Sequence, residues 1–218
     1  MQRLGIVHTV SQLAPTFAEL AGELLPGVEL AVIADELLLK RTVCDGAIDV
    51  VTRTRLHGHV AALAEFGVDA VLVTCSSVGG VADEIALRTA IPVVRVDRPM
   101  AERAITLGQR IGVLATLPTT LAPTTELVGT AARGAGRDVE VVSRLCDGAF
   151  AALERGERQR HDEIIAEELD RLAGEVDVVV LAQASMARIA AARAGGGTPV
   201  LSSPRLAMEH LANVRAAC

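Results

Sequence analysis

Short apolar segments rich in β-branched residues alternate along the whole chain with longer segments of mixed apolar and charged residues. Within 159–173, for example, Ile165, Leu169 and Leu172 recur at helical spacing with charged residues between them. Strands that alternate with amphipathic helices form βαβ units, whose strands pair in parallel. The pattern therefore predicts an α/β fold.

Each half of the chain is predicted to hold strands and helices in alternation. In the first half we expect strands at 3–8, 28–34, 69–74 and 92–96, and helices at 13–25, 52–66, 78–89 and 100–107. In the second half we expect strands at 110–115, 138–144, 176–182 and 199–202, and helices at 122–134, 158–173, 184–194 and 205–216.

Three segments recur in the same order in the two halves, about 107 positions apart. Residues 3–9 (RLGIVHT) return as 110–116 (RIGVLAT), 68–73 (VDAVLV) as 176–181 (VDVVVL), and 91–94 (IPVV) as 198–201 (TPVL). Repetition in order at nearly constant spacing indicates an internal duplication. We therefore expect two pseudo-symmetric Rossmann-like or flavodoxin-like halves, each with a short parallel sheet flanked by helices.

The duplication also predicts domain boundaries and the place of a site. We expect one half at 1–97, together with a C-terminal helix at about 206–218, and the other at 98–205. Open α/β sheets bind ligands at the carboxyl ends of their strands. The sequence thus predicts an active-site cleft between the halves, lined by the residues that follow each strand.

Composition and charge narrow the possible functions. Half of the residues are hydrophobic, but there are three Phe and no Trp or Tyr, so the core must be aliphatic. A net charge of −6 and the lack of a basic stripe with aromatic residues argue against nucleic-acid binding. No apolar run approaches the roughly 18 residues of a membrane span, and the segment before the first strand lacks the long apolar stretch expected of a signal peptide. We expect a cytoplasmic protein that does not bind membranes.

Cys75 is the strongest candidate for chemistry. It follows a predicted strand and precedes a predicted helix, where backbone N–H groups and the helix dipole favour a thiolate and bind a carboxylate. Other polar residues at strand ends could bind a substrate carboxylate or cap helices; they are Thr9, Ser76, Ser77, Thr116, Thr119, Gln183 and Ser185. Cys44 and Cys146 precede Asp-Gly pairs and are interpreted as filler beside turns.

The segment 71–77 (VLVTCSS) resembles the first cysteine motif of the aspartate/glutamate/hydantoin racemase superfamily, and 115–120 (ATLPTT) resembles the threonine-rich loop that opens the second half of those enzymes. With the duplication, the resemblance covers essentially the whole chain. It implies that Cys75 is catalytic and that the enzyme is a homo-oligomer without a cofactor, acting on a small carboxylic acid. In that family one thiolate removes the proton alpha to a carboxylate, and a second thiol returns a proton from the opposite face.

The sequence departs from that pattern at Gln183, which stands where the second cysteine should be. A glutamine amide cannot act as a catalytic acid or base near pH 7, although it can hydrogen-bond a carboxylate or enolate oxygen. A single thiol is compatible with isomerisation by proton transfer on one face and with covalent addition to an activated double bond, as in the related maleate isomerases. It is also compatible with decarboxylation, as in the related arylmalonate decarboxylases. A non-catalytic carboxylate-binding protein is a third possibility.

Three further residues are candidates. His8 follows the first strand and could polarise a substrate oxygen or act as a second base, or simply pack there. Asp35 could bind a substrate hydroxyl or amine, or cap the next helix; His161 opens a charged helix and could approach the cleft. No cysteine or histidine spacing predicts a metal site, and no glycine-rich segment has the strand–loop–helix context of a nucleotide site.

Overall fold

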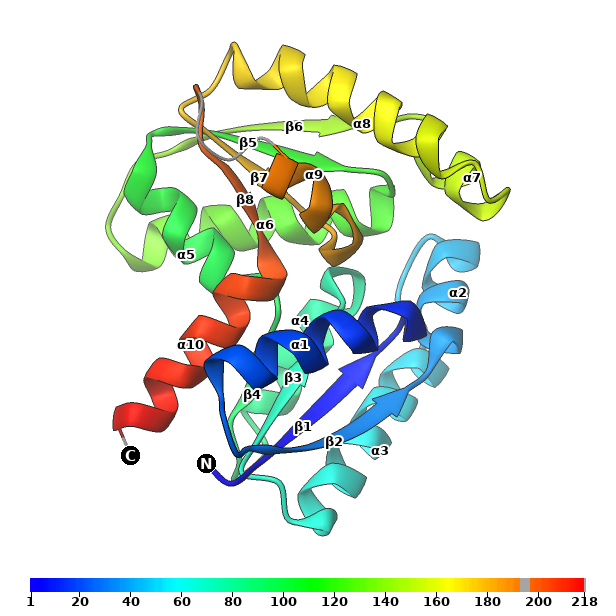
Figure 1. Ribbon diagram of the computed structural model, residues 1–218, viewed down its shortest axis with the longest axis vertical. Helices are drawn as coiled ribbons and strands as arrows, with labels where there is room; N and C mark the ends of the chain where they lie inside the picture. The colour runs from blue at the N-terminus through cyan, green and yellow to red at the C-terminus, as the bar shows by residue number, and fades with distance from the viewer. Residues whose placement is uncertain (193–196, 218) are drawn as a thin grey trace. The chain divides into compact units, whose positions relative to one another are not determined.

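The computed structural model describes residues 1–192 and 197–217. The chain divides into two compact units, one formed by Met1–Asp97 with the residues from Pro204 onward, and the other by Arg98–Ser203 (Figure 1). Each unit contains one parallel sheet of four strands flanked by helices, which confirms the predicted fold class. Within the described residues no helix is long and apolar enough to cross a membrane.

The first unit has the strand order β2-β1-β3-β4, with all neighbours parallel. Its strands are β1 (Arg3–His8), β2 (Glu29–Ala34), β3 (Ala70–Val73) and β4 (Val93–Arg95). Its helices are α1 (Ala14–Leu24), α2 (Glu36–Asp45), α3 (Val50–Phe66), α4 (Gly79–Ala86) and α10 (Ser203–Ala217), with short 3-10 helices η1 (Ser11–Leu13) and η2 (Ser76–Val78).

The second unit repeats this order as β6-β5-β7-β8. Its strands are β5 (Arg110–Ala115), β6 (Glu140–Leu145), β7 (Val178–Leu181) and β8 (Val200–Ser202). Its helices are α5 (Arg98–Leu107), α6 (Pro118–Gly134), α7 (Ala149–Glu154), α8 (Arg158–Ala173) and α9 (Ala187–Ala192), with the 3-10 helix η3 (Ala184–Met186). Flavodoxin-like sheets begin with the same strand order.

The two faces of the first sheet are covered by different helices, because strand side chains alternate between faces. Leu4 and Ile6 of β1 pack with α1 and α10, whereas Val7 packs with α3 and α4. Figure 1 shows α1 and α3 on opposite sides of the sheet. In the second sheet, α8 and α9 pack on one face, and α5 and α6 also contact the strands.

Two helices belong to a different unit from the strand that precedes them in the chain. Helix α5 follows β4 of the first sheet but belongs to the second unit, where it contacts β7 and β8. Helix α10 follows β8 of the second sheet, and from Pro204 onward it belongs to the first unit. Its residues Ala207, Met208 and Leu211 are buried in that unit's core. Each sheet is therefore completed by a helix that follows the other sheet.

The repeated Val-Asp pair has a structural explanation. Asp69 Oδ2 accepts hydrogen bonds from the backbone N–H groups of Gln2 and Arg3, the latter at 2.9 Å. Asp177 Oδ2 accepts the equivalent bonds from Gln109 and Arg110, both at 2.8 Å. These bonds lower the pKa of both carboxyl groups. In each unit the aspartate before the third strand thus joins that strand to the start of the first.

Helices α2 and α7 were not predicted. Asp35 begins α2 as its N-cap, accepting from Leu37 N, and Gly46 ends it with φ 67°. These start and stop signals are present in the sequence, but the segment was interpreted as a strand-end loop and a turn. Helix α6 begins at Pro118 rather than at 122, so that Thr119 and Thr120 form its first turn and Pro123 lies inside it. The predicted helix 184–194 is η3 followed by α9, and its last two residues lie outside the described residues.

Glycine at the centre of β1 and β5 allows a helix to pack closely on each sheet. A Cβ added to Gly112 would lie 2.8 Å from Leu172 Cγ, and one added to Gly5 would lie 3.1 Å from Leu63 Cδ1. We expect Gly112→Ala to lower the free energy of unfolding by about 1–3 kcal/mol through overpacking, and Gly5→Ala to lower it less. Urea unfolding followed by circular dichroism measures both.

Gly22→Ala is the matched control, because nothing lies within 4 Å of a Cβ at this position in α1. It should leave stability unchanged or raise it by up to about 1 kcal/mol. A Gly112→Ala protein as stable as Gly22→Ala would contradict this interpretation of the packing.

Candidate active site

The register between β1 and β3 determines which strand-end residues meet. Val7 pairs with Val73, and the ladder continues with a hydrogen bond of 3.0 Å from Thr74 N to Val7 O. In the second unit Leu114 pairs with Leu181, and Ala182 N donates to Leu114 O at 2.9 Å. In each unit, the residues two positions after the two paired residues therefore lie opposite each other. This places Thr9 beside Cys75, and Thr116 beside Gln183.

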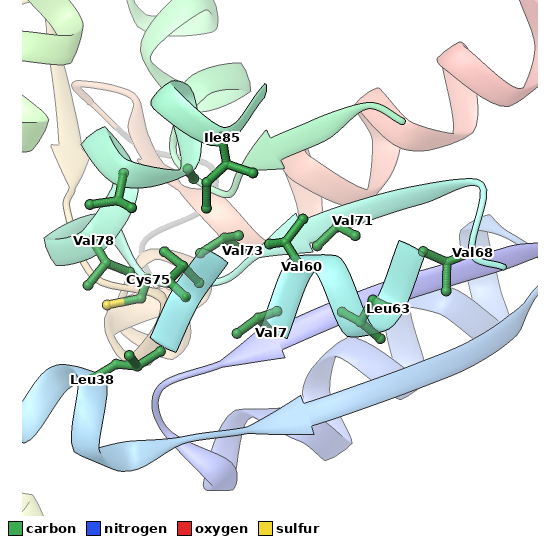
Figure 2. Packing of buried hydrophobic residues seen from close by; sticks show 13 residues of the cluster. Val7, Leu38, Val60, Leu63, Val68, Val71, Val73, Cys75, Val78 and Ile85 are labelled. Atoms are coloured by element: carbon green, nitrogen blue, oxygen red, sulfur yellow. The ribbon is translucent and has the colours of Figure 1, made fainter. Parts of the chain in front are cut away.

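Cys75 is the second residue after β3 and directly precedes η2 in an extended conformation, with φ −135° and ψ 117°. It is 8% exposed and belongs to the apolar cluster between the sheet and α3. Figure 2 shows its sulfur beside Leu38 of α2 and Val78 of η2. The thiol is thus a buried group with an apolar wall on one side.

Burial raises the pKa of the Cys75 thiol above its ordinary value. Hydrogen bonds from the Thr9 hydroxyl, from the backbone N–H groups of Val78 and Ser77 and from the Ser77 hydroxyl act in the opposite direction but do not outweigh it. The position at a strand end before a helix therefore does not by itself lower the pKa of this thiol. Desolvation dominates over the local donors, so Cys75 is a protonated thiol at neutral pH.

In the second unit the equivalent residues, Thr116 and Gln183, are hydrogen-bonded to each other. Gln183 Oε1 accepts from Thr116 N at 2.6 Å and from Thr116 Oγ1 at 3.0 Å. Gln183 Nε2 lies 2.8 Å from Thr116 Oγ1. These contacts fix the orientation of the amide, which offers hydrogen bonds but does not act as an acid or a base near pH 7.

The predicted polar residues thus form two sets, one in each unit. Thr9, Ser76 and Ser77 are buried around Cys75. In the second unit Ser185 is half-buried in η3, two residues after Gln183. Thr119 lies in the first turn of α6, and within the described part of the chain its buried Oγ1 has no hydrogen-bond partner.

His8 lies at the end of β1 on the face opposite to Val7, where it is fully buried with its ring 5.4 Å from that of Phe17. Its Nδ1 is 2.8 Å from Thr74 Oγ1, and that hydroxyl donates to Val7 O at 3.2 Å. Nδ1–H is therefore the donor, and Nε2 is a buried nitrogen with no partner among the described residues. Burial lowers the pKa of His8 to about 4, so the ring is neutral at pH 7. Thr74 was not predicted as a site residue; the register of β1 with β3 places it beside His8.

Asp35 and His161 join neither set. Asp35 caps α2, and its Oδ2 accepts from Arg55 Nε at 2.8 Å and lies 2.7 Å from His59 Nε2. Burial opposes its ionisation, but these bonds outweigh burial and lower its pKa. His161 is buried in α8 with Nδ1 2.7 Å from Asp162 Oδ1. Both residues therefore hold structural contacts within their own units.

Cys146 and Cys44 differ sharply in environment. Cys146 is fully buried, and burial raises its pKa to about 12, as expected for apolar filler. Cys44 is exposed on α2. Among the described residues, Cys75 is the cysteine that combines burial with several hydrogen-bond donors.

The model of a protein family described as Asp/Glu/Hydantoin racemase matches residues 9–211. The chain belongs to this family. The match spans both units and includes every strand-end residue described above except His8.

Several solved structures of racemases are similar to the chain over almost its whole length. Glutamate racemase isoform RacE1 from Bacillus anthracis is 18% identical, with a TM-score of 0.79, covering 99% of this chain and 82% of that one. Allantoin racemase from Klebsiella pneumoniae is 20% identical, with a TM-score of 0.72, covering 100% and 89%. A putative Asp/Glu racemase from Yersinia pestis is 16% identical, with a TM-score of 0.73, covering 99% and 100%. At these identities the likeness establishes the racemase-family fold. A search of curated proteins finds no match to the chain.

The buried His8 predicts a specific pH dependence of stability. Its pKa is near 6.5 when unfolded and about 4 when folded, so the unfolded state binds the proton more strongly. Stability from this residue is complete above pH 6.5, falls as the pH drops, and reaches a loss of about 3 kcal/mol near pH 4. His8→Asn retains a partner for Thr74 but does not titrate. We expect the stability difference between wild type and variant to change by about that amount between pH 7 and pH 4, measured by urea unfolding; a difference independent of pH would contradict the assignment.

Proposed function

We propose that this protein is a cofactor-independent isomerase that acts on a small carboxylic acid through the thiol of Cys75. The observation that carries the proposal is the buried thiol faced by donors from Thr9, Ser77 and Val78, in a chain of the Asp/Glu/hydantoin racemase family. Hydroxyl and backbone N–H donors of this kind can bind a carboxylate and stabilise the charge that develops when its α-carbon loses a proton. An amino, hydroxy or dicarboxylic acid is the substrate class.

The proposed step transfers one proton. In the fraction of molecules in which Cys75 is ionised, its thiolate accepts the proton from the α-carbon, and the C–H electron pair moves into the carboxylate to form an enediolate. Return of the proton from the thiol to a different carbon, conjugated with the enediolate, completes an isomerisation, whereas return to the α-carbon on the same face regenerates the substrate. We propose that Gln183 contributes to the same reaction as a hydrogen-bond donor to a substrate oxygen, because it cannot act as the opposing acid.

A decarboxylase on this scaffold is the second candidate, and the protonated state of Cys75 favours it. In that reaction the C–C bond to a carboxylate breaks, CO2 leaves, and the electron pair remains on the α-carbon. A neutral thiol then donates its proton to that carbon. This chemistry needs an acid on one face only, which fits one thiol and one amide.

Deuterium incorporation distinguishes the two reactions. The protein is incubated in D2O with panels of amino, hydroxy and malonic acids, and substrate and product are analysed by NMR. An isomerase places deuterium on the α-carbon of recovered substrate. A decarboxylase releases CO2 and labels only the product. Ligand binding without label or CO2 would instead support a carboxylate-binding protein.

The residue assignment is tested with two cysteine variants. We expect Cys75→Ala to lower the turnover of an identified substrate by at least about 100-fold, since it removes the proton-transferring group. Cys44→Ser is the matched control, because Cys44 is exposed on α2, and it should retain wild-type turnover. Full activity of Cys75→Ala on the same substrate would contradict both candidate reactions.

A further inference from the structure

A buried arginine lies in the same unit as Cys75, at the end of β4. The Arg95 side chain is 5% exposed, and it donates from Nε to Asp97 Oδ1 at 2.7 Å and from Nη2 to Asp97 Oδ2 at 2.9 Å. Its Nη1 donates to Asp83 Oδ2 at 2.8 Å. Burial alone would lower the pKa of Arg95, but the two carboxylates outweigh burial and raise it. A two-point pair with Asp97 and a third contact on Asp83 hold the guanidinium plane in one orientation.

The guanidinium lies directly against the backbone at Gly79. A Cβ added there would be 2.5 Å from both Cζ and Nη2 of Arg95, and 2.7 Å from its Nε. The Gly79 backbone is ordinary right-handed helix, with φ −59° and ψ −36°, so that alanine is conformationally permitted. The requirement for glycine at this position comes from the arginine.

Gly79 is the residue next to η2 and begins α4. The short segment from Cys75 to Gly79 is therefore held at one end by the β3 ladder and at the other by Arg95. The donors that face the sulfur, on Ser77 and Val78, lie between these two points.

The second unit supplies an internal comparison. At the positions equivalent to Gly79 and Arg95 it has Ala187, the first residue of α9, and Ser202, the last residue of β8. Gln183 occupies the position of the thiol in that unit. The close glycine–arginine contact therefore occurs in the unit that carries Cys75. The equivalent turn in the second unit, η3 after Gln183, has neither the glycine nor the arginine.

We infer that Arg95 is a positioning residue for the Cys75 thiol, acting through its contact with Gly79. It keeps the η2 turn in the place where the Ser77 and Val78 N–H groups face the sulfur. The inference rests on the proposed function for its role in catalysis, whereas its physical effect on the thiol can be measured without any substrate.

The test compares Gly79→Ala with Gly80→Ala, two single-methyl changes at adjacent positions of α4. Nothing lies within 4 Å of a Cβ at Gly80. Alkylation of the folded proteins by iodoacetamide is followed across pH with peptide-resolved mass spectrometry, using the exposed Cys44 as an internal reference. Because the displaced donors favour the thiolate, we expect the alkylation midpoint of Cys75 to rise by about one pH unit in Gly79→Ala. Gly80→Ala should keep the wild-type midpoint.

Arg95→Lys gives a second, independent measurement, since lysine keeps the charge but loses the two-point pair. The alkylation midpoint of Cys75 should rise in this variant as well. If Arg95→Lys fails to fold, Asp83→Asn replaces it, and we expect a smaller rise of the midpoint. Identical midpoints in Gly79→Ala and Gly80→Ala would overturn the inference. If Gly79→Ala raises the midpoint but the wild-type protein turns over no carboxylic acid, the proposed function is refuted and the positioning role stands. If the wild-type protein turns over a carboxylic acid but Gly79→Ala does not raise the midpoint, the positioning role is refuted and the proposed function stands.

Discussion

The register between the first and third strands of each sheet is the constraint on which the candidate site depends. Because Val7 pairs with Val73, Thr9 comes opposite Cys75, and the equivalent pairing in the second unit brings Thr116 to Gln183. A shift by one residue would turn these side chains to the other face of the sheet. An aspartate joins the start of the third strand to the start of the first, as Asp69 does in the first unit. It therefore holds the same strand pair at the end opposite to the candidate site.

Burial and local hydrogen bonding compete at Cys75, and burial is the stronger effect. Burial also lowers the pKa of His8, which gives a neutral ring whose Nε2 has no hydrogen-bond partner among the described residues. At Asp35 the balance is reversed, since Arg55 and His59 outweigh burial. The unit thus places two neutral titratable groups at the ends of its two central strands, with charged pairs at the ends of the outer strands β2 and β4. With this distribution, a Cys75 thiol that donates a proton fits the site as well as a thiolate that removes one.

Much of this could be predicted from the sequence, because the repeat at about 107 positions identifies equivalent strands without any structure. Strand periodicity and the position of Cys75 follow from local pattern. The direction of the thiol pKa does not, since it depends on how completely α2 and η2 cover the sulfur, and α2 was not predicted. Nor does the role of Arg95, because its contact with Gly79 joins residues from two elements whose separation is set by packing.

Divergence of the two units is concentrated at a few positions of an otherwise shared scaffold. Both keep the strand order, the aspartate before the third strand and the glycine at the centre of the first. They differ where Cys75 is replaced by Gln183 and Arg95 by Ser202. A buried ion pair is weak evidence for stability, because apolar residues can fill the same space at lower desolvation cost. Because the second unit has Ser202 at the position of Arg95, the pair beside the thiol is better explained by the orientation it imposes on the neighbouring turn than by its contribution to folding.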